Sequence, residues 1–279
     1  MLRLLYDFDS HRGRGGGIVF LIIPLILITF FKFNYSIYLV IIPLAIAGFY
    51  DDIFSLKSLP RFIIQLITVN VIILLFLNQI SLTLNLYIFV FLLLIGTSII
   101  NFANFIDGID GLLCSLAIIF FVATTLILKT NTYMPLIGSL SSFYIFNRHP
   151  AKVFMGDVGS TLIGSLIFYA LINSNNYLEF TKLLLIISPI VFDCISCILI
   201  RIIKKENIFK PHSLHLYQRL VKNGISHNKV TYIYSISSIL IAFSAYFFPL
   251  KVEIIISIIV FILGIYLNYK KACPIYLFK

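Results

Sequence analysis

The sequence is dominated by apolar segments that approach the length of a membrane-spanning helix. A helix needs about 20 apolar residues to cross a bilayer, and such runs recur along the whole chain. Hydrophobic residues make up 60% of the 279 residues and charged residues only 11%, whereas soluble domains are nearer about half and about a quarter. Because backbone polar groups must be paired inside lipid, we expect an all-α, polytopic membrane bundle formed as one domain, residues 1–279.

We expect about ten transmembrane helices in this bundle. The expected spans are residues 18–31, 36–50, 62–77, 83–101, 112–128, 133–146, 159–173, 180–201, 230–248 and 252–267. Several are shorter than ideal, so tilt or bilayer thinning must absorb the mismatch. The start, MLRLLYDFDSHRGRGGG, is polar and basic and does not resemble a cleavable signal peptide.

Lys and Arg are distributed unevenly between the two sets of loops. If the termini and every second loop share one side, that side carries 17 of the 21 basic residues. The positive-inside rule makes this side cytoplasmic. Topology therefore explains much of the net charge of +10, and no nucleic-acid partner is expected.

The few acidic residues gather on the same side of the membrane. Asp51 and Asp52 end the second span, Asp107 and Asp110 lie in NFANFIDGIDGL, and Asp157 lies in MGDVGS. A carboxylate inside the bilayer costs about 2.5–3.5 kcal/mol even on a lenient scale, so these groups must meet water, cations or each other. Mutual repulsion and oxygen-only ligands favour Mg²⁺, or Mn²⁺, in a cavity that faces the cytoplasm.

The polar stretch NFANFIDGIDGL separates two apolar spans. Asn101, Asn104 and Asp107 are three residues apart, so on a continuing helix they form one polar stripe. A turn that merely joins two helices is the simpler interpretation. A polar stripe at the cytoplasmic end of a hydrophobic helix indicates instead one wall of a site, and the other loops favour this second interpretation.

Further loops carry groups that suit a phosphate. MGDVGS places an aspartate between glycines at a helix start, whose N–H groups would face an anion. HSLHLYQR holds His212, His215 and Arg219, which offer donors to a phosphate; the two histidines would equally suit zinc, but no third ligand is near. HRGRGGG, with Arg14, is either a second anion cradle or a plain positive flank. LPRFIIQ adds Arg61 after the acidic pair.

Asp193 is expected inside a span, in SPIVFDCI. A carboxylate within the membrane indicates a functional site by default. A structural partner for an Asn or Tyr on a neighbouring helix is an equal alternative, and the sequence leaves both open.

The chain resembles the polyprenyl-phosphate N-acetylhexosamine-1-phosphate transferases, glycosyltransferase family 4. The matching motifs are, in order, HRGRGGG, DDIFSL with LPRFIIQ, NFANFIDGIDGL, FNRHPAKVFMGDVGS and HSLHLYQRL, within about residues 11–220. NxxNxxDGxDGL together with MGDVGS is highly specific. The HxxHxYQ form is most similar to the branch that starts O-antigen or capsule chains, and less similar to the peptidoglycan branch.

The resemblance implies transfer of an N-acetylhexosamine-1-phosphate from a UDP-sugar to polyprenyl (undecaprenyl) phosphate, which gives polyprenyl-diphospho-sugar and UMP. This is the initiating step of lipopolysaccharide O-antigen or other cell-envelope polysaccharide synthesis. The implied enzyme is a multi-pass protein of the bacterial inner membrane, with its active site facing the cytoplasm, and the resemblance allows a homodimer. A phosphate monoester is largely ionised at neutral pH, so we expect a single direct displacement without a covalent intermediate.

The resemblance also implies roles for individual residues. The implied catalytic set is Asp51, Asp52, Asp107, Asp110 and Asp157. The implied substrate-binding set is Asn101, Asn104, His212, His215, Arg219, Arg14 and Arg61. Asp157 is implied as the leading Mg²⁺ ligand, with Asn101 beside it.

Two features depart from the family pattern. The family usually has another span before HRGRGGG, and only about ten residues precede it here; Ser213 stands where an Arg usually follows the first histidine, so Arg219 or Lys210 is the expected substitute. The rival classes are the aspartate-rich membrane prenyltransferases and the CDP-alcohol phosphotransferases. The first needs longer DxxxD-type motifs and the second a DGxxAR continuation, and the sequence has neither.

Overall fold

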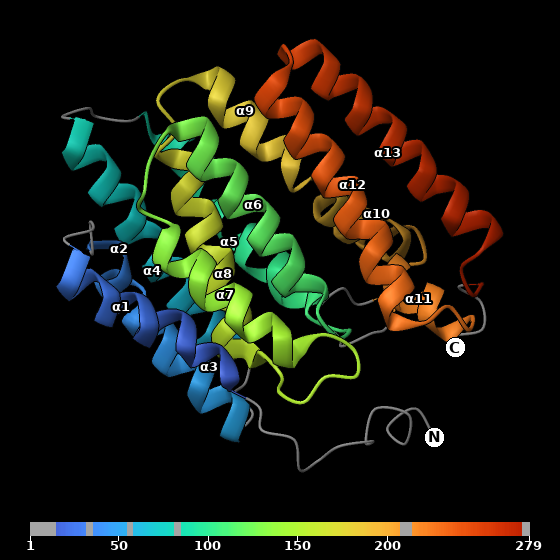
Figure 1. Cartoon of the computed structure of the whole chain (residues 1–279), viewed down its shortest axis with the longest axis horizontal. Helices are drawn as coiled ribbons and strands as arrows, with labels where there is room; N and C mark the ends of the chain where they lie inside the picture. Colours follow the sequence, from blue (N-terminus) through green and yellow to red (C-terminus); the bar gives the residue numbers. More distant parts are fainter. Residues whose placement is uncertain (1–14, 32–35, 55–57, 81–84, 207–213, 275–279) are drawn as a thin grey trace.

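The computed structural model describes residues 15–31, 36–54, 58–80, 85–206 and 214–274, which form an all-helical bundle without strands (Figure 1). The elements are η1 (Gly16–Ile18), α1 (Val19–Phe31), α2 (Ser36–Val40), α3 (Ile42–Phe54), α4 (Ser58–Ile80), α5 (Leu86–Ile106), α6 (Leu112–Leu128), α7 (Met134–Asn147), α8 (Gly156–Ile172), α9 (Tyr177–Ile186), α10 (Ser188–Ile203), α11 (Leu216–Lys222), α12 (His227–Phe247) and α13 (Leu250–Lys270).

Helices coincide with all the expected spans, and the all-α, polytopic fold class is confirmed. Among the described helices, α4, α5, α12 and α13 are each long and apolar enough to cross a bilayer alone, and the bent pair of α9 and α10 qualifies together. Helices α6 and α8 have 17 residues each, about 25 Å at 1.5 Å per residue. Both are shorter than a hydrocarbon core of about 30 Å.

Two of the expected spans are interrupted. Ile41 separates α2 from α3, and Ile187 separates α9 from α10, where the chain bends by 67°. Pro43 and Pro189 are each the second residue of the helix that follows the break. A proline at this position has no N–H to donate to the preceding turn and disfavours a helical conformation in the residue before it. The prolines therefore explain why each span is divided.

Helix α8 is the central element of the bundle (Figure 1). Every side chain from Val158 to Ile172 is buried, and α3 and α5 pack against them. A Cβ at Gly48 would lie 2.6 Å from the Cα of Val158, and one at Gly164 would lie 2.6 Å from the Cα of Ile100. Only glycine permits such an approach. Close packing at these two points brings together the helix ends that carry the acidic residues.

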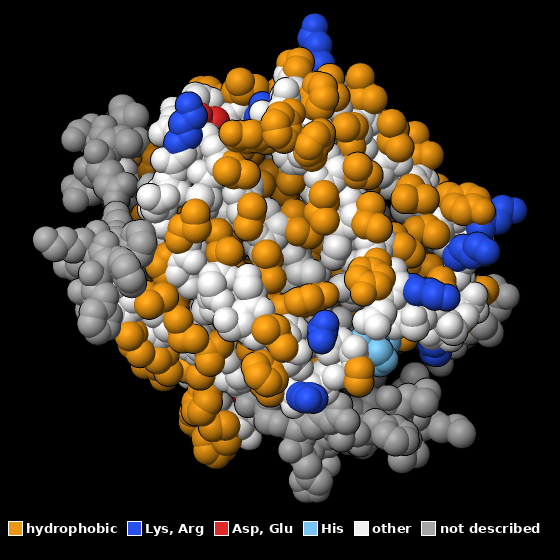
Figure 2. Space-filling model, viewed as in Figure 1, with side chains coloured by type: hydrophobic (Ala, Val, Ile, Leu, Met, Phe, Trp, Pro, Cys, Tyr) orange, Lys and Arg blue, Asp and Glu red, His pale blue; other side chains and the backbone are white. Residues whose placement is uncertain are grey.

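Large apolar side chains cover much of the exterior, as Figure 2 shows for one face. Phe91 on α5 is 61% exposed and Ile259 on α13 is 59% exposed. Helices α12 and α13 lie side by side at one edge of the bundle (Figure 1). An apolar surface of this extent suits contact with lipid and not with water, as expected for an integral membrane protein.

Candidate active site

The N-terminus of α8 is capped by a carboxylate from another helix. Gly156, the first residue of α8, has a φ of +73°, which favours glycine. Near the end of α3, Asp52 accepts hydrogen bonds from the backbone N–H of Asp157 (2.8 Å, Oδ1) and of Val158 (3.3 Å, Oδ2). We expected these N–H groups to face an external anion. They donate instead to Asp52, because α3 approaches α8 closely enough for its carboxylate to serve as the cap.

Arg61 on α4 connects two of the predicted catalytic acids. Its Nη1 lies 2.6 Å from Oδ2 of Asp51 and 3.1 Å from Oδ2 of Asp157. The side chain of Asp51 is only 3% exposed, whereas that of Asp157 is 27% exposed. The three residues line a small recess between α3, α4 and α8. The positive charge of Arg61 thus partly balances the two acids, and the Asp157 side of the group is the accessible one.

The asparagines of the expected polar stripe lie on successive turns of α5. Nδ2 of Asn101 donates to Oε1 of Gln65 (3.0 Å) and to the carbonyl oxygen of Thr97 (2.8 Å). Gln65 also lines the recess that contains Asp157, so it connects Asn101 to that site. Asn104 is half-buried one turn later. Helix α5 ends before Asp107, whose N–H caps the helix by donating to the carbonyl oxygen of Asn104 (3.3 Å).

Asp107 is half-buried among the other acids. Burial, and then the negative charges of Asp157 and Asp52, raise the pKa of Asp107 well above its ordinary value. Such a concentration of carboxylates favours the binding of a divalent cation through oxygen ligands.

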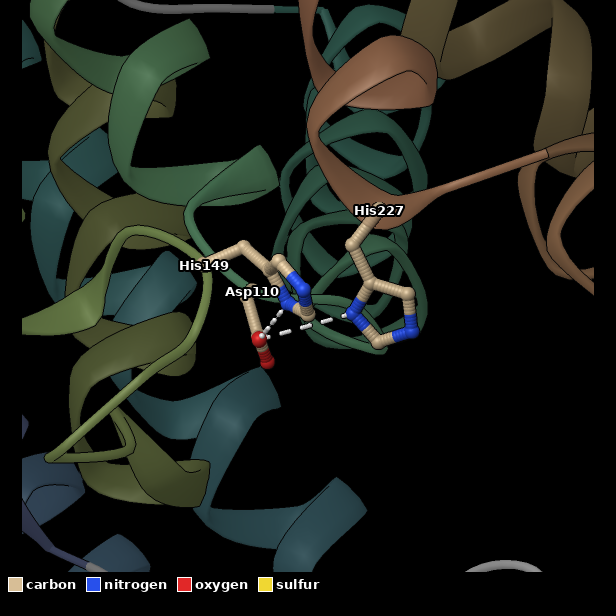
Figure 3. Close-up of side chains that lie close together, drawn as sticks. All are labelled: Asp110, His149 and His227. Atoms are coloured by element: carbon tan, nitrogen blue, oxygen red, sulfur yellow. Dashed lines mark hydrogen bonds and ion pairs between the residues drawn. The ribbon is translucent and has the colours of Figure 1, made fainter.

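Asp110 is paired with histidines and not with the other acids. Its Oδ2 lies 2.7 Å from Nδ1 of His149, accepts the N–H of Ala151 (3.2 Å), and lies 3.5 Å from Nδ1 of His227 (Figure 3). Burial opposes ionisation, but the contacts with His227 and His149 and the backbone hydrogen bond from Ala151 outweigh it and lower the pKa of Asp110 to about 2. The carboxylate is therefore ionised at neutral pH.

Asp193 on α10 holds neighbouring elements together. Its Oδ1 accepts the backbone N–H of Leu216 (2.7 Å). Its Oδ2 accepts the backbone N–H of Tyr217 (3.3 Å) and the hydroxyl of Tyr234 on α12 (2.6 Å). Asp193 thus caps the N-terminus of α11 and ties it to two other helices. Of the two interpretations left open by the sequence, these contacts support the structural one.

His215 is the N-cap residue of α11 and is 3% exposed. Its Nδ1 lies 3.5 Å from Oδ1 of Asp193. The ring centroid lies 5.7 Å from that of Phe105 and 5.8 Å from that of Tyr217. The imidazole therefore faces Asp193 inside an aromatic environment, and its contact with a phosphate stays a prediction.

Helix α11 packs against the loop that carries Asp107 and Asp110. The hydroxyl of Tyr217 donates to the carbonyl oxygen of Phe105 (2.7 Å). A Cβ at Gly108 would collide with that hydroxyl, so a glycine is required at this point. The motifs NFANFIDGIDGL and HSLHLYQR are therefore in direct contact.

Arg219 has a structural position in α11. It is 2% exposed, and its guanidinium donates to the carbonyl oxygens of Cys273 (2.9 Å, Nε) and Asn268 (3.3 Å, Nη2). These bonds tie α11 to the end of α13. The substrate contact that the sequence suggested for Arg219 stays a prediction.

Several predicted residues lie outside the described part of the chain, namely Arg14, Lys210, His212 and Ser213. Their contacts with phosphate stay predictions. Within the described part, Asp51, Asp52, Arg61, Asp107 and Asp157 lie at one end of the bundle. Asp110, His215 and Arg219 make the separate contacts given above.

The sequence assigned no role to His149, His227 or Tyr234. A signal was present for the histidines: the chain has only five, and one of them lies in FNRHPAKVFMGDVGS. In a chain so poor in polar residues, a histidine in a loop on the acidic side is a candidate partner for a carboxylate. Nothing in the sequence marked Tyr234 among the 16 tyrosines.

The fold and the site define a polytopic all-α membrane protein with carboxylates gathered at one end of its bundle. The family model for glycosyl transferase family 4 matches residues 34–175, just over half of the chain. The chain therefore belongs to glycosyl transferase family 4.

Curated relatives are similar to this chain over half of its length or more. This chain is 30% identical over 226 residues to the probable undecaprenyl-phosphate N-acetylglucosaminyl 1-phosphate transferase of Bacillus subtilis. The match covers 70% of this chain and 62% of that protein. The chain is 33% identical over 156 residues to the phospho-N-acetylmuramoyl-pentapeptide-transferase of Carboxydothermus hydrogenoformans, covering 52% and 47%. It is 28% identical over 239 residues to the decaprenyl-phosphate N-acetylglucosaminephosphotransferase of Mycobacterium leprae, covering 71% and 60%. The chain thus spans about half to three fifths of the length of these relatives.

Proposed function

We propose that this protein transfers an N-acetylhexosamine-1-phosphate from a UDP-sugar to polyprenyl phosphate and releases UMP. The observation that carries the proposal is the group of acids at one end of a membrane bundle: Arg61 pairs with Asp51 and Asp157, Asp52 accepts the N–H of Asp157, and Asp107 senses the charges of Asp157 and Asp52. The names of the relatives describe transfer to undecaprenyl or decaprenyl phosphate, or of a phospho-sugar peptide, and membership of the family supports the same chemistry here.

In this proposal the site faces the cytoplasm from the bacterial inner membrane. The polyprenyl (undecaprenyl) phosphate comes from the bilayer and the UDP-N-acetylhexosamine from the cytosol. The segments on the side of the acidic group also carry basic residues, including Arg148 and Lys152 between α7 and α8 and Lys222 at the end of α11. The positive-inside rule supports a cytoplasmic position for that side.

The proposed reaction is a direct displacement at phosphorus. An oxygen of the polyprenyl phosphate forms a bond to the sugar-linked phosphorus, and the bond from that phosphorus to the bridging oxygen breaks as UMP leaves with the electron pair. Such reactions depend on positioning and on charge neutralisation more than on proton transfer. Arg61 supplies one positive charge, held in place by Asp51, and Asp52 fixes the backbone at Asp157.

The proposed metal ion is Mg²⁺, or Mn²⁺, with Asp157 and Asn101 as ligands. The residues fit this ion because they offer oxygen donors. Nδ2 of Asn101 donates to Gln65 and to Thr97, which leaves the amide oxygen for a cation. When bound, the ion would neutralise phosphate charge.

We also propose that the reaction begins O-antigen or another cell-envelope polysaccharide. The HxxHxYQ form of the loop at residues 212–218 supports this branch. The relatives' names include N-acetylglucosamine enzymes and the phospho-N-acetylmuramoyl-pentapeptide-transferase, so the sugar has to be determined by experiment.

The test is a lipid-labelling assay. Membranes that contain the protein are incubated with undecaprenyl phosphate and, in turn, radiolabelled UDP-N-acetylglucosamine, UDP-N-acetylgalactosamine, their 6-deoxy counterparts and UDP-N-acetylmuramoyl-pentapeptide. We expect one of the simple hexosamines to label the lipid with an equimolar release of UMP, and the pentapeptide donor to give no label.

The assay also separates the rival classes. A prenyltransferase would release diphosphate from a prenyl diphosphate, and a CDP-alcohol phosphotransferase would release CMP. Folded protein that releases no UMP with any of the donors would overturn the proposal. Labelling only from the pentapeptide donor would contradict the branch but not the reaction.

A further inference from the structure

Three side chains that commonly bind metals meet beside the loop of NFANFIDGIDGL. Asp110 lies between α5 and α6, His149 between α7 and α8, and His227 is the first residue of α12 (Figure 3). One ligand atom from each lies within 4.8 Å of the others. Among the residues that the structure describes, this is the one group of three His, Cys, Asp or Glu side chains that meets this condition.

The spacing of the donor atoms is close to that of a metal site. Oδ2 of Asp110 lies 2.7 Å from Nδ1 of His149 and 3.5 Å from Nδ1 of His227. Zn²⁺ binds nitrogen and oxygen at about 2.0–2.2 Å in a tetrahedron, which places its ligand atoms roughly 3.3–3.5 Å apart. The separation of Asp110 and His227 matches this spacing, that of Asp110 and His149 is shorter, and all three donor atoms lie within 4.8 Å of one another.

Nδ1 of His227 is the second observation that points to a ligand. This atom is buried and has no hydrogen-bond partner in the described part of the chain. It is directed at the carboxylate of Asp110 (Figure 3), at a distance that is long for a hydrogen bond. Burial of a polar atom without a hydrogen bond is unfavourable. A metal ion would satisfy this nitrogen by accepting its lone pair.

The surrounding hydrogen bonds hold the cluster together without a metal ion. The N–H of Ala151 donates to Oδ2 of Asp110 (3.2 Å). The hydroxyl of Thr231, one turn along α12 from His227, donates to the backbone oxygen of Asp110 (3.1 Å). Outer contacts of this kind orient metal ligands in advance. The side chains of His149 and His227 are 39% and 32% exposed, so an ion can reach the cluster from solvent.

We propose that Asp110, His149 and His227 bind a transition-metal ion of the Zn²⁺ class. Two imidazole nitrogens and one carboxylate oxygen suit Zn²⁺, Co²⁺ or Ni²⁺, whereas Mg²⁺ prefers oxygen-only ligands such as those around Asp157. The chain therefore offers two cation sites with different ligand chemistry. Three protein ligands leave one tetrahedral position open for a water or a phosphate oxygen.

The binding site stands independently of the proposed transferase activity. An effect of zinc on UMP release would rest on the proposed function, because Asp110 belongs to the implied catalytic set. The test therefore measures binding directly, and its failure would leave the transferase proposal intact.

The experiment uses the full chain, purified in detergent through a tag without histidine and stripped with EDTA. Zn²⁺ is titrated calorimetrically in the presence of excess Mg²⁺, and the zinc-loaded protein is examined by X-ray absorption. We expect one Zn²⁺ per chain, with imidazole scattering from two histidines. His149→Gln and His227→Gln should each weaken zinc binding by at least about tenfold, since loss of an outer partner alone costs roughly 10–100-fold.

Two matched variants serve as controls. His215→Gln removes an imidazole outside the cluster, and Asp157→Asn removes a carboxylate from the other cation site; both should retain one Zn²⁺ per chain. Folded wild-type protein without stoichiometric zinc binding would show that the cluster is only a carboxylate in contact with two histidines, and the proposal would be wrong. Zinc binding unchanged in both cluster variants would overturn it equally. If a variant does not fold, the wild-type absorption spectrum decides, because an oxygen-only shell contradicts the assignment.

Discussion

Oδ1 of Asp52 accepts the backbone N–H of Asp157 at 2.8 Å, so one predicted catalytic acid positions another. The two residues are 105 positions apart in the sequence, on α3 and α8. Because Oδ2 also accepts the N–H of Val158, the carboxylate of Asp52 is engaged with the helix start on both oxygens. A role for Asp52 in holding α8 therefore has to be separated from a role in the reaction itself.

Asp52→Asn should lower stability more than Asp157→Asn does. The amide keeps one acceptor oxygen but turns an NH₂ group toward a backbone N–H, so most of the cap is lost. Loss of a cap costs about 0.5–2 kcal/mol, and 1 kcal/mol corresponds to roughly 2–4 °C in melting temperature for domains only slightly smaller than this chain. Thermal unfolding of both variants in detergent measures the difference. Equal melting temperatures would contradict the capping role.

The bond between Tyr234 and Asp193 gives a second stability prediction. The hydroxyl of Tyr234 donates to a buried carboxylate at 2.6 Å, and hydrogen bonds to charged groups contribute about 1.5–3 kcal/mol. Tyr234→Phe should therefore lower the melting temperature measurably. Tyr232→Phe is the matched control, since Tyr232 lies on the same helix and is 58% exposed. A melting temperature that falls equally in both variants would argue against the structural role of Asp193.

The positions of the spans were predictable because each span is a continuous run of apolar residues in the sequence. The span expected at residues 112–128 coincides with α6, and most others agree within a few residues. The breaks at Ile41 and Ile187 were missed, although Pro43 and Pro189 are visible, because hydrophobicity continues across them. The apolar composition predicts which segments lie in the membrane, but it does not predict whether the helix in a segment is continuous.

The acidic group was predictable from topology, whereas its internal pairing was not. Alternating loops placed Asp51, Asp107 and Asp157 on one side of the membrane, and the structure brings them together with Asp52. That Asp52 would cap α8, and that Asp110 would face two histidines, depends on helix packing between distant segments. No local sequence pattern predicts these contacts. Aspartates that look alike in the sequence, such as Asp52 and Asp110, therefore have different partners in the fold.

Removal of the divalent cation should abolish activity. EDTA should stop UMP release from wild-type membranes, and added Mg²⁺ should restore it. Asp157→Asn should reduce the rate by at least about a hundredfold, the scale of losing one electrostatic contact to a reacting group. Glu179→Gln is the matched control, because Glu179 is a half-buried acid near the N-terminus of α9 that accepts hydrogen bonds from Asn175. Normal rates in EDTA or in Asp157→Asn would contradict the metal assignment.

Cysteine labelling should place the acidic end of the bundle in the cytoplasm. Asn175, between α8 and α9, and Lys152, between α7 and α8, are both exposed. A cysteine at Asn175 should react with an impermeant thiol reagent in intact cells once the outer membrane is permeable. A cysteine at Lys152 should react only after the inner membrane is opened.

The native cysteines give little background in this measurement, because Cys114, Cys194, Cys197 and Cys273 are all buried. The unsubstituted protein is the control for their labelling. The reverse accessibility of the two introduced cysteines would place the acidic residues away from cytosolic UDP-sugars and would contradict the count of Lys and Arg.

The last prediction separates a catalytic wall from a simple turn in NFANFIDGIDGL. Asp107→Asn and Asp110→Asn keep the size of the side chain and one acceptor oxygen but remove the carboxylate, so each should lower UMP release by at least about a hundredfold. Ile109 is 8% exposed and Phe102 is partly buried against the core. Ile109→Leu conserves volume and should cost less than about 1.5 kcal/mol, and Phe102→Leu should likewise leave most activity.

The four variants are compared in membranes at matched protein levels. If the stretch only joins two helices, the order is reversed: the two amide variants are harmless, and the variants of the packed apolar residues lose folded protein. Asp110→Asn also weakens the contact with His149, so its melting temperature is measured beside its rate. A rate that falls without a fall in melting temperature assigns Asp107 and Asp110 to the reaction, whereas near-normal rates in both amide variants assign the stretch to a polar turn.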